Sequence, residues 1–272
     1  MAGLGYAAEG LAAARAARSP AAEAVALVSM AAMRLELEGP APWRELRPEV
    51  ERIAVPDRLP YVLLTICWVE LNLAALRGDL DEAGRRASQL WDLSRDSAIP
   101  AREVHAVAGL VLQRAWDPAL LRELVELPGV IDSVNDLPMN WASLHGFLGR
   151  AGMVDELRVR LRTMPYAEPQ ETWQTLSAWS YEAEGAHAVG DRALAERCYA
   201  TLAPYAGRMS VAGAAGVQGP VDGYLALAAR TLGDHEAARW HAGEARRLAT
   251  EWGLSAYLAW LDRHEARWTA QA

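Results

Sequence analysis

The sequence predicts an all-α fold, namely an α-solenoid of about six antiparallel helix pairs followed by a C-terminal helix. The first observation is the composition, since 52% of the residues are hydrophobic, many of them Ala and Leu, as in folded, helix-rich chains. The second is a series of amphipathic helix pairs that meet at turns. The third is the spacing of these turns, which lie 39, 38, 36, 38 and 43 residues apart. Such a period is typical of helical repeat proteins.

The clearest helix pair spans Pro220 to Ala249, where two amphipathic helices meet at Gly233-Asp234. The same plan recurs upstream, and the turn positions are Gly39, Gly78, Trp116, Gly152, Gly190 and Gly233. Small residues share a second position, five residues after a turn glycine, at Ala83, Ala195 and Ala238. A small side chain lets two helices approach closely, so we expect these alanines at helix–helix contacts.

Helix-start and helix-stop residues place the remaining elements. Ser19-Pro20 is a start signal, because Ser can cap a helix and Pro suits its first position. Gly39-Pro40 ends the second helix, and Pro56 and Pro60 mark a linker. The other expected helices are Ala2 to Arg18, Ala21 to Glu38, Trp43 to Ile53, Tyr61 to Arg77, Leu80 to Arg95, Arg102 to Ala115, Ala119 to Leu127, Asn140 to Ala151, Val154 to Met164, Glu171 to Val189, Arg192 to Tyr205 and Leu254 to Ala270.

We expect one domain over the 272 residues, which are enough for a single elongated repeat domain. Its expected parts are a degenerate N-terminal cap region (1–58), the central repeats (59–206), a Gly-rich link (207–219) and the last repeat with a capping helix (220–272). The Gly-rich link is expected to be flexible. Its apolar residues Met209, Val211 and Val217 leave open a partial docking of the link onto the solenoid.

Charge and hydropathy exclude several classes of protein. The net charge of -8 disfavours a direct nucleic-acid binder, since binding phosphates needs a basic surface. The chain has no Lys, which excludes a Walker A loop and a Schiff-base lysine. The apolar run Tyr61 to Val69 is only nine residues long, so we expect a buried helix and no membrane contact. The N-terminus lacks the order of a secretory signal, and we expect a cytoplasmic protein.

The residues with reactive or metal-binding side chains form no recognisable site. Cys67 and Cys198 lie in apolar helical patterns, and we expect both to be buried and reduced. Two thiols alone cannot make a zinc site, and no pair of the six histidines has the HExxH spacing. We therefore expect solvated or capping histidines and no metal, with His145 packed among other side chains.

Two further patterns contain residue types that are found in catalytic or phosphate-binding sites. Ser180 and His187 share a helix face but lie about 10 Å apart by helix rise, too far for a direct hydrogen bond. Gly213, Gly216 and Gly219 do not match the spacing GxGxxG, so a link is favoured over a phosphate cradle. The functional alternative is a loop that folds over a ligand at the mouth of a groove. We expect no catalytic residue and no cofactor.

Two units carry a resemblance to a known family. Trp141 and Trp179 each lie eleven residues before a turn glycine. The first continues through Leu144, Leu148, Gly152 and Leu157, and the second through Ala183, Gly190, Ala195 and Tyr199. This spacing resembles tetratricopeptide repeats, which implies a right-handed superhelix whose outgoing helices line the concave face. Ala242 in place of the usual aromatic residue and Trp116 in place of a turn glycine depart from the pattern.

The C-terminal third carries a narrower resemblance. The segments LAPYAGR (Leu202 to Arg208), GPVDGYLALAARTLGDHEAA (Gly219 to Ala238) and WGLSAYLAW (Trp252 to Trp260) are similar to the repeat region of actinobacterial regulators of the LuxR, SARP and cyclase-linked types. Those regulators also carry a nucleotide-binding module. This sequence has neither a P-loop nor a recognisable helix-turn-helix reader, so their ATPase and DNA-binding activities are not carried over.

The resemblance implies a set of binding residues on the concave face. Transferred residue by residue, its groove positions are Trp68, Asn72, Gln113, Ser180, Glu184, His187 and Arg230. We therefore expect a non-enzymatic sensor or scaffold region of a bacterial signalling or transcription-regulatory protein. It would bind a peptide, a protein or a small-molecule effector in an open groove.

Two other functions stay open. One is a small-molecule-binding enzyme or carrier of a biosynthetic pathway, in which the last helix and the Gly-rich link would seal the concavity around an apolar pocket. The other is a self-associating scaffold, and a homodimer is compatible with any of these functions.

Overall fold

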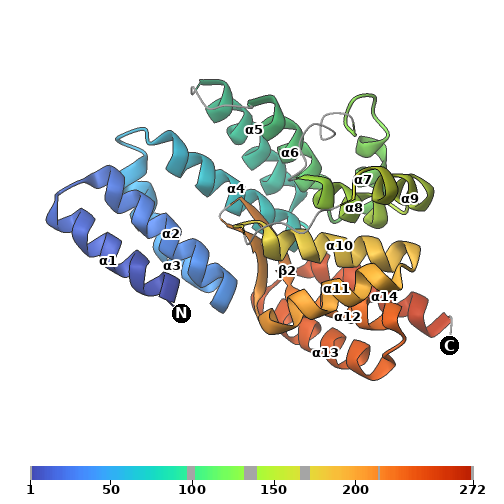
Figure 1. Cartoon of the computed structure of the whole chain (residues 1–272). Helices are drawn as coiled ribbons and strands as arrows, with labels where there is room; N and C mark the ends of the chain where they lie inside the picture. Colours follow the sequence, from blue (N-terminus) through green and yellow to red (C-terminus); the bar gives the residue numbers. More distant parts are fainter. Residues whose placement is uncertain (1, 97–101, 132–139, 166–171, 214, 271–272) are drawn as a thin grey trace.

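The computed structural model describes residues 2–96, 102–131, 140–165, 172–213 and 215–270. Within these residues the chain forms fourteen α-helices, a short 3-10 turn (η3, Ala203–Tyr205) and one two-stranded sheet, which confirms the all-α class. Figure 1 shows the N-terminal helices at one end of the molecule and the C-terminal helices at the other, with one central helix between them.

The helices agree with the predicted ranges to within a few residues at each end. They are α1 (Ala2–Ala16), α2 (Pro20–Glu38), α3 (Ala41–Ala54), α4 (Pro60–Arg77), α5 (Leu80–Asp96), α6 (Arg102–Arg114), α7 (Pro118–Val125), α8 (Trp141–Arg150), α9 (Val154–Thr163), α10 (Thr175–Val189), α11 (Arg192–Leu202), α12 (Val221–Leu232), α13 (His235–Trp252) and α14 (Ser255–Ala270). The start of the predicted helix at Glu171 lies outside the described residues.

Local chemistry explains why the helices end where they do. Gly78, Gly190 and Gly233 adopt left-handed conformations with φ of 74°, 75° and 82°, which end α4, α10 and α12. Asp191 and Asp234 follow two of these glycines, and each side chain accepts a backbone N–H in the first turn of the next helix. A glycine that stops one helix and an aspartate that starts the next therefore define each of these turns.

Consecutive helices pack side by side along the chain, as α4 does with α5, α10 with α11 and α12 with α13. The three alanines five residues after a turn glycine, Ala83, Ala195 and Ala238, are buried, which confirms their place at helix–helix contacts. Helices that are not consecutive in the sequence also pack together: α8 lies directly against α10, and α10 lies against α12. Thus α8, α10 and α12 pack against one another in turn, and α4 packs against α2 and α6.

The Gly-rich segment differs from the expected flexible link. It forms an antiparallel hairpin of β1 (Met209–Ala212) and β2 (Gly216–Pro220), with an irregular register between Ser210 and Val211. Glycine lowers strand propensity, so the local sequence does not indicate strands. Burial of Met209 and Val217 stabilises them, and the hydroxyl of Tyr224 donates to the carbonyl of Gln218 over 2.8 Å.

The C-terminal helix α14 returns to the middle of the molecule. It packs against α4 as well as against its neighbour α13, although about 180 residues separate α14 from α4 in the sequence. Tyr257 and Trp260 of α14 are fully buried. One hydrophobic core consequently extends from Ala24 in α2 to Trp268 in α14.

The central helix α4 is long and apolar enough, by length and composition alone, to cross a membrane. Its 18 residues have a mean hydropathy of 1.2, and it is the one described helix with the length and composition of such a span. However, 78% of it is buried inside the protein. It contacts α5, α6, the hairpin and α14, so it is a core helix, as the sequence predicted for Tyr61 to Val69.

Gly39, at the end of α2, lies against Trp252 of α13, and its substitution tests this contact between N-terminal and C-terminal helices. Its φ of 78° and ψ of -162° fall in a region that glycine alone occupies readily, and an added Cβ would overlap the indole of Trp252 in α13. We expect Gly39→Ala to lower the free energy of unfolding by about 3 kcal/mol in urea denaturation.

The matched control is Gly190→Ala. This glycine is also left-handed, but an added Cβ would meet no atom within 4 Å. The backbone penalty alone predicts a loss of about 1 kcal/mol. Equal losses for the two variants would contradict the contact between Gly39 and Trp252.

Candidate functional site

The residues predicted to line an open concave groove are mostly covered by the chain itself. Asn72 and Ser180 lie under the β-hairpin, whereas Glu184, His187 and Arg230 face α14. Asn72, Ser180 and Glu184 are buried, whereas His187 and Arg230 are half-buried. The expectation of an open groove at Asn72, Ser180 and Glu184 is therefore corrected, because the hairpin and α14 cover these side chains.

The hairpin covers Asn72 and Ser180 through polar contacts. The Asn72 side-chain amide donates to the carbonyls of Trp68, over 2.7 Å, and Ala215, over 3.2 Å. The hydroxyl oxygens of Ser180 and Ser210 lie 2.8 Å apart. Both Asn72 and Ser180 are buried, so their hydrogen-bonding groups hold the hairpin to α4 and α10.

Glu184 of α10 lies at the centre of a buried polar cluster. Arg150 of α8 donates from Nε to Oε1 over 3.0 Å and from Nη2 to Oε2 over 2.6 Å. Trp260 of α14 donates from Nε1 to the same Oε1 over 2.8 Å. The side chains of Arg150 and Glu184 are each only 1% exposed. Three helices thus meet at one carboxylate.

The guanidinium of Arg150 also fixes the turn between α6 and α7. It donates to the carbonyl of Ala115 over 3.0 Å and lies 4.0 Å from the centre of the Trp116 ring. Burial disfavours its charge, but the Glu184 carboxylate more than offsets this and holds the pKa of Arg150 above its ordinary value. Trp116, where the repeat pattern expects glycine, packs against Tyr257 and Trp260 of α14.

A pair of histidines lies beside this cluster. His187 and His264 have ring centres 5.3 Å apart and line a small cavity of about 190 Å³ together with Glu184 and Arg267. His187 Nδ1 lies 3.0 Å from the hydroxyl of Thr231, which ties α10 to α12. Burial, and then the charges of Arg230 and Arg267, lower the pKa of His187 to about 4. Burial, then His187 and the charges of Arg267, Arg150 and Arg263, lower the pKa of His264.

The other reactive side chains serve packing. His145 is fully buried and bonded through Nδ1 to Glu182 over 2.7 Å, which confirms the expectation that it is packed. Both cysteines are free and buried, as expected, and burial raises the pKa of Cys67 to about 12. Such a thiol stays protonated and is a poor nucleophile. Within the described ranges no three His, Cys, Asp or Glu side chains converge as metal ligands.

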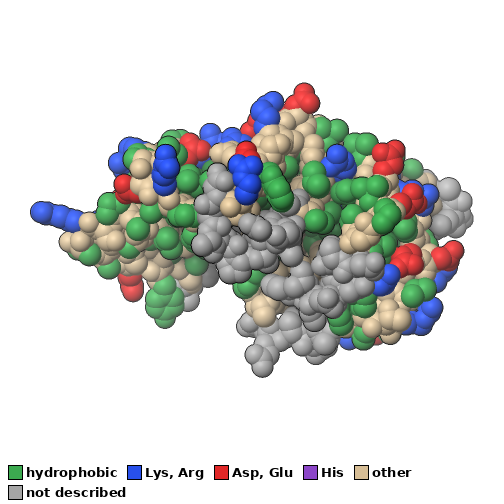
Figure 2. Space-filling view, turned by 90° about the horizontal axis from the view of Figure 1, so that it is seen from above, with side chains coloured by type: hydrophobic (Ala, Val, Ile, Leu, Met, Phe, Trp, Pro, Cys, Tyr) green, Lys and Arg blue, Asp and Glu red, His purple; other side chains and the backbone are tan. Residues whose placement is uncertain are grey.

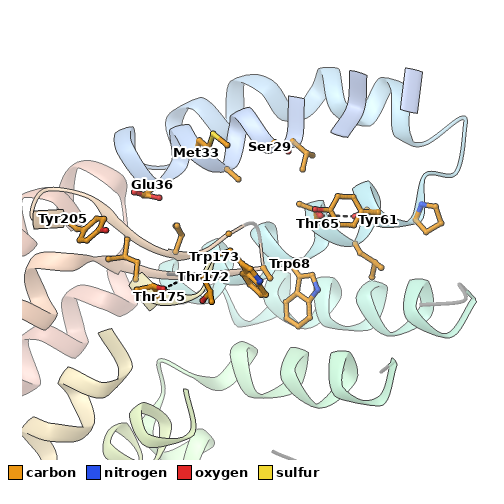
Figure 3. Close-up of a pocket in the computed structure, with 18 residues that line it drawn as sticks. Ser29, Met33, Glu36, Tyr61, Thr65, Trp68, Thr172, Trp173, Thr175 and Tyr205 are labelled. Atoms are coloured by element: carbon orange, nitrogen blue, oxygen red, sulfur yellow. Dashed lines mark hydrogen bonds between the residues drawn. The ribbon is translucent and has the colours of Figure 1, made fainter. Parts of the chain in front are cut away.

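An apolar cleft of about 1120 Å³ lies between α2, α4, the start of α10 and the hairpin (Figure 3). Trp68 is the one predicted groove residue that lines it. The eighteen lining residues are Val28, Ser29, Ala32, Met33, Glu36, Pro60, Tyr61, Leu64, Thr65, Trp68, Thr172, Trp173, Thr175, Leu176, Tyr205, Val211, Gly213 and Ala215.

Water reaches the cleft, because several of its large side chains are exposed. Tyr61 is 62% exposed and Trp173 is 55% exposed. The charged lining residue Glu36 is paired with Arg208, Nη1 to Oε1, over 3.0 Å. Seen from above, Arg and acidic side chains are interspersed with hydrophobic ones on the coloured surface (Figure 2).

Sequence reasoning missed most of this cleft. Gln113 was predicted as a groove residue, but it lies against Gly84 of α5, outside the cleft. Trp173 was not singled out, because it carries no repeat signature and was placed inside the predicted helix Glu171 to Val189, whereas α10 begins only at Thr175. One signal was available in α2, where Val28, Ala32 and Glu36 follow an i, i+4 spacing along one face, with Ser29 and Met33 beside them.

Comparison of the chain with protein-family models, with curated proteins and with solved structures finds no match.

Removing one partner of the buried ion pair tests the central cluster. We expect Glu184→Gln to lower the free energy of unfolding by about 3–5 kcal/mol, because Arg150 keeps its charge without a counter-ion. The double variant Arg150→Met/Glu184→Gln should lose less than the sum of the single losses, since no buried charge remains unpaired. Urea denaturation measures both.

The control is Glu36→Gln. Its partner Arg208 is 37% exposed and Glu36 is 28% exposed, so solvent screens this pair. We expect a loss below about 1 kcal/mol. A loss at Glu184 as small as this would contradict a central role for the pair.

The histidine pair predicts a pH dependence of stability. The unfolded chain binds a proton at His187 near pH 6.5, whereas the folded chain binds it only near pH 4. The unfolded state therefore holds more protons between these values, and the free energy of unfolding falls as the pH falls from 6.5 to 4, by at most about 3 kcal/mol for His187. We expect His187→Gln to flatten this fall in urea denaturation at pH 7, 5.5 and 4.5. If the free energy of unfolding falls with pH equally in the wild type and in His187→Gln, His187 is not a source of the pH dependence.

Proposed function

We propose that this chain is a non-catalytic ligand-binding module and that its binding site is the apolar cleft between α2, α4 and the hairpin. One observation carries the proposal. A cleft of about 1120 Å³ stays open and keeps large aromatic side chains in contact with water, whereas Asn72, Ser180 and Glu184 are buried beneath the hairpin and α14. Ligand sites are typically concave and mostly apolar, with a few polar groups.

The exposed aromatic side chains supply the driving force for binding. Burial of apolar surface contributes about 25 cal/mol per Å², and aromatic residues dominate the energetics of binding sites. Tyr61 and Trp173 lie at the mouth of the cleft, with Leu64 and Leu176 among its apolar lining residues. A ligand that covered them would gain affinity without a large rearrangement of the helices.

We further propose that the helix pairs form a tetratricopeptide-like right-handed superhelix whose concave face holds α14 and the hairpin. The turn spacing, the left-handed turn glycines and the buried alanines after them support this arrangement. The resemblance of Leu202 to Leu261 to bacterial regulators supports a place in cytoplasmic signalling or transcription regulation. The module would then act as the sensor of an effector molecule.

The carrier function is the second candidate, and the burial of Asn72, Ser180 and Glu184 supports it, because these residues leave no exposed surface for a peptide. The lining residues within the described ranges include no His or Cys, and Glu36 is paired with Arg208. We therefore propose binding or carriage of a small molecule over catalysis on it.

Blocking the cleft tests the proposal. Ser29 lies on the α2 wall and bonds only within its own helix, Oγ to the carbonyl of Val25 over 2.8 Å. We expect Ser29→Trp to place an indole in the cleft and to weaken binding by at least about tenfold. Ser29→Ala keeps the space open and should bind as the wild type does.

The measurement is a thermal-shift and titration screen with neutral aliphatic compounds, neutral aromatic compounds and an amphipathic peptide. Ligands that raise the Tm of the wild type and of Ser29→Ala, but not of Ser29→Trp, support the cleft. If every compound acts equally on all three proteins, the cleft is not the binding site.

A further inference from the structure

We propose that the ligand of the cleft is a neutral, planar, polycyclic aromatic molecule that carries hydroxyl and carbonyl groups. This inference rests on the proposed function and names the class of molecule that the site would take. It follows from four properties of the cleft: its aromatic content, its size, its charge and its free hydrogen-bonding groups.

Aromatic side chains are concentrated in the cleft. Four of its eighteen lining residues are aromatic, whereas aromatic residues make up 7% of the whole chain. Figure 3 shows Trp68 and Trp173 on one side, with Ser29 and Met33 of α2 on the opposite side. Aromatic rings prefer offset-stacked or edge-to-face contacts with other rings, and a flexible Met side chain adapts to a flat surface. A planar ligand would contact both walls at once.

The size of the cleft argues against a compact ligand. A volume of about 1120 Å³ lies slightly above the range for small-molecule sites, which is roughly 300–1,000 Å³. An aromatic cage for a quaternary ammonium ion needs its rings within about 6 Å of one cationic centre. Figure 3 shows the labelled aromatic residues spread from Tyr205 at one end to Tyr61 at the other, which suits several fused rings.

The charge of the cleft favours a neutral ligand. Glu36 is the one charged side chain among the described lining residues, and its charge is balanced by Arg208 over 3.0 Å. An ionised ligand would lose its hydration in an apolar site and would find no counter-ion there, which is costly. A neutral molecule carries no such cost.

The hydroxyl groups of the cleft show which polar atoms the ligand needs. Thr65 and Ser29 donate their protons to backbone carbonyls, to Tyr61 and to Val25, so each hydroxyl oxygen is left as an acceptor. Thr175 instead accepts the backbone N–H of Thr172 over 2.9 Å, so its hydroxyl proton can donate to a ligand. A hydroxyl group on the ligand ring can donate to Ser29 of α2 or Thr65 of α4. A carbonyl group on the ring can accept from Thr175.

The experiment compares three probes by equilibrium titration of the full chain. The first is 1,4-dihydroxyanthraquinone, which is neutral and planar and carries both polar groups. The second is anthraquinone-2-sulfonate, which has similar rings and a negative charge, and the third is 1-dodecanol, which is neutral and aliphatic. We expect the first probe to bind at least about tenfold more tightly than either of the others.

Substitutions of Trp173 test whether the probe binds in the cleft. We expect Trp173→Leu to weaken binding of the dihydroxyanthraquinone by about tenfold and Trp173→Phe to restore part of the loss, because a ring is available again for stacking. The matched control is Trp240→Leu in α13, since Trp240 is also exposed, at 61%, and does not line the cleft. This control should bind as the wild type does.

The outcomes separate the ligand class from the proposed function. If 1-dodecanol binds as tightly as the dihydroxyanthraquinone and Ser29→Trp blocks both, the aromatic class is overturned and the binding function stands. If the sulfonate binds more tightly, the neutral character is overturned. If an amphipathic peptide displaces the bound probe at lower concentration than any small molecule, the occupant is a polypeptide and the class is wrong. If no probe distinguishes Ser29→Ala from Ser29→Trp, both the class and the binding function fail.

Discussion

The carboxylate of Glu184 accepts hydrogen bonds from Arg150 of α8 and from Trp260 of α14, at a site from which water is excluded. Such a pair costs desolvation energy, and the geometry offsets that cost only when every polar atom has a partner. Here the bidentate contact, the Ala115 carbonyl and the ring of Trp116 provide those partners. The position of α14 depends on this arrangement, because Trp260 must bring its indole N–H to the same oxygen.

The placement of α14 determines which side chains of the other helices stay exposed. Because α14 and the hairpin cover Asn72, Ser180 and Glu184, these residues belong to the core. A cleft stays open between the N-terminal helix α2, the central helix α4 and the hairpin. The hairpin therefore has two roles, since one side covers Asn72 and Ser180 while Val211 and Gly213 form a wall of the cleft. The helix α4 and the hairpin line the apolar cleft, and they also contact α14 and α10, which carry the polar cluster.

The candidate site was predictable only in part. Trp68 was selected from the repeat register, and it does line the cleft. The register also placed Asn72, Ser180 and Glu184 on the inner side of the outgoing helices, but it could not show that other segments cover them. Trp173 and Met33 lacked a signal of comparable strength, because their exposure depends on how α2 and the segment before α10 are placed in space. Roles of the buried residues in binding stay predictions.

The sequence by itself determined the helices and their turns, because these depend on neighbours within a few residues. The left-handed conformation of Gly233 and the cap by Asp234 are local, and so are the alternating apolar and polar faces. Only the tertiary structure decided the strands, the insertion of α14 and the cleft. Those features depend on contacts such as Arg208 with Glu36 and Trp260 with Glu184, whose partners are 172 and 76 residues apart. Pairing over such distances follows from the burial of the whole core, which no local pattern encodes.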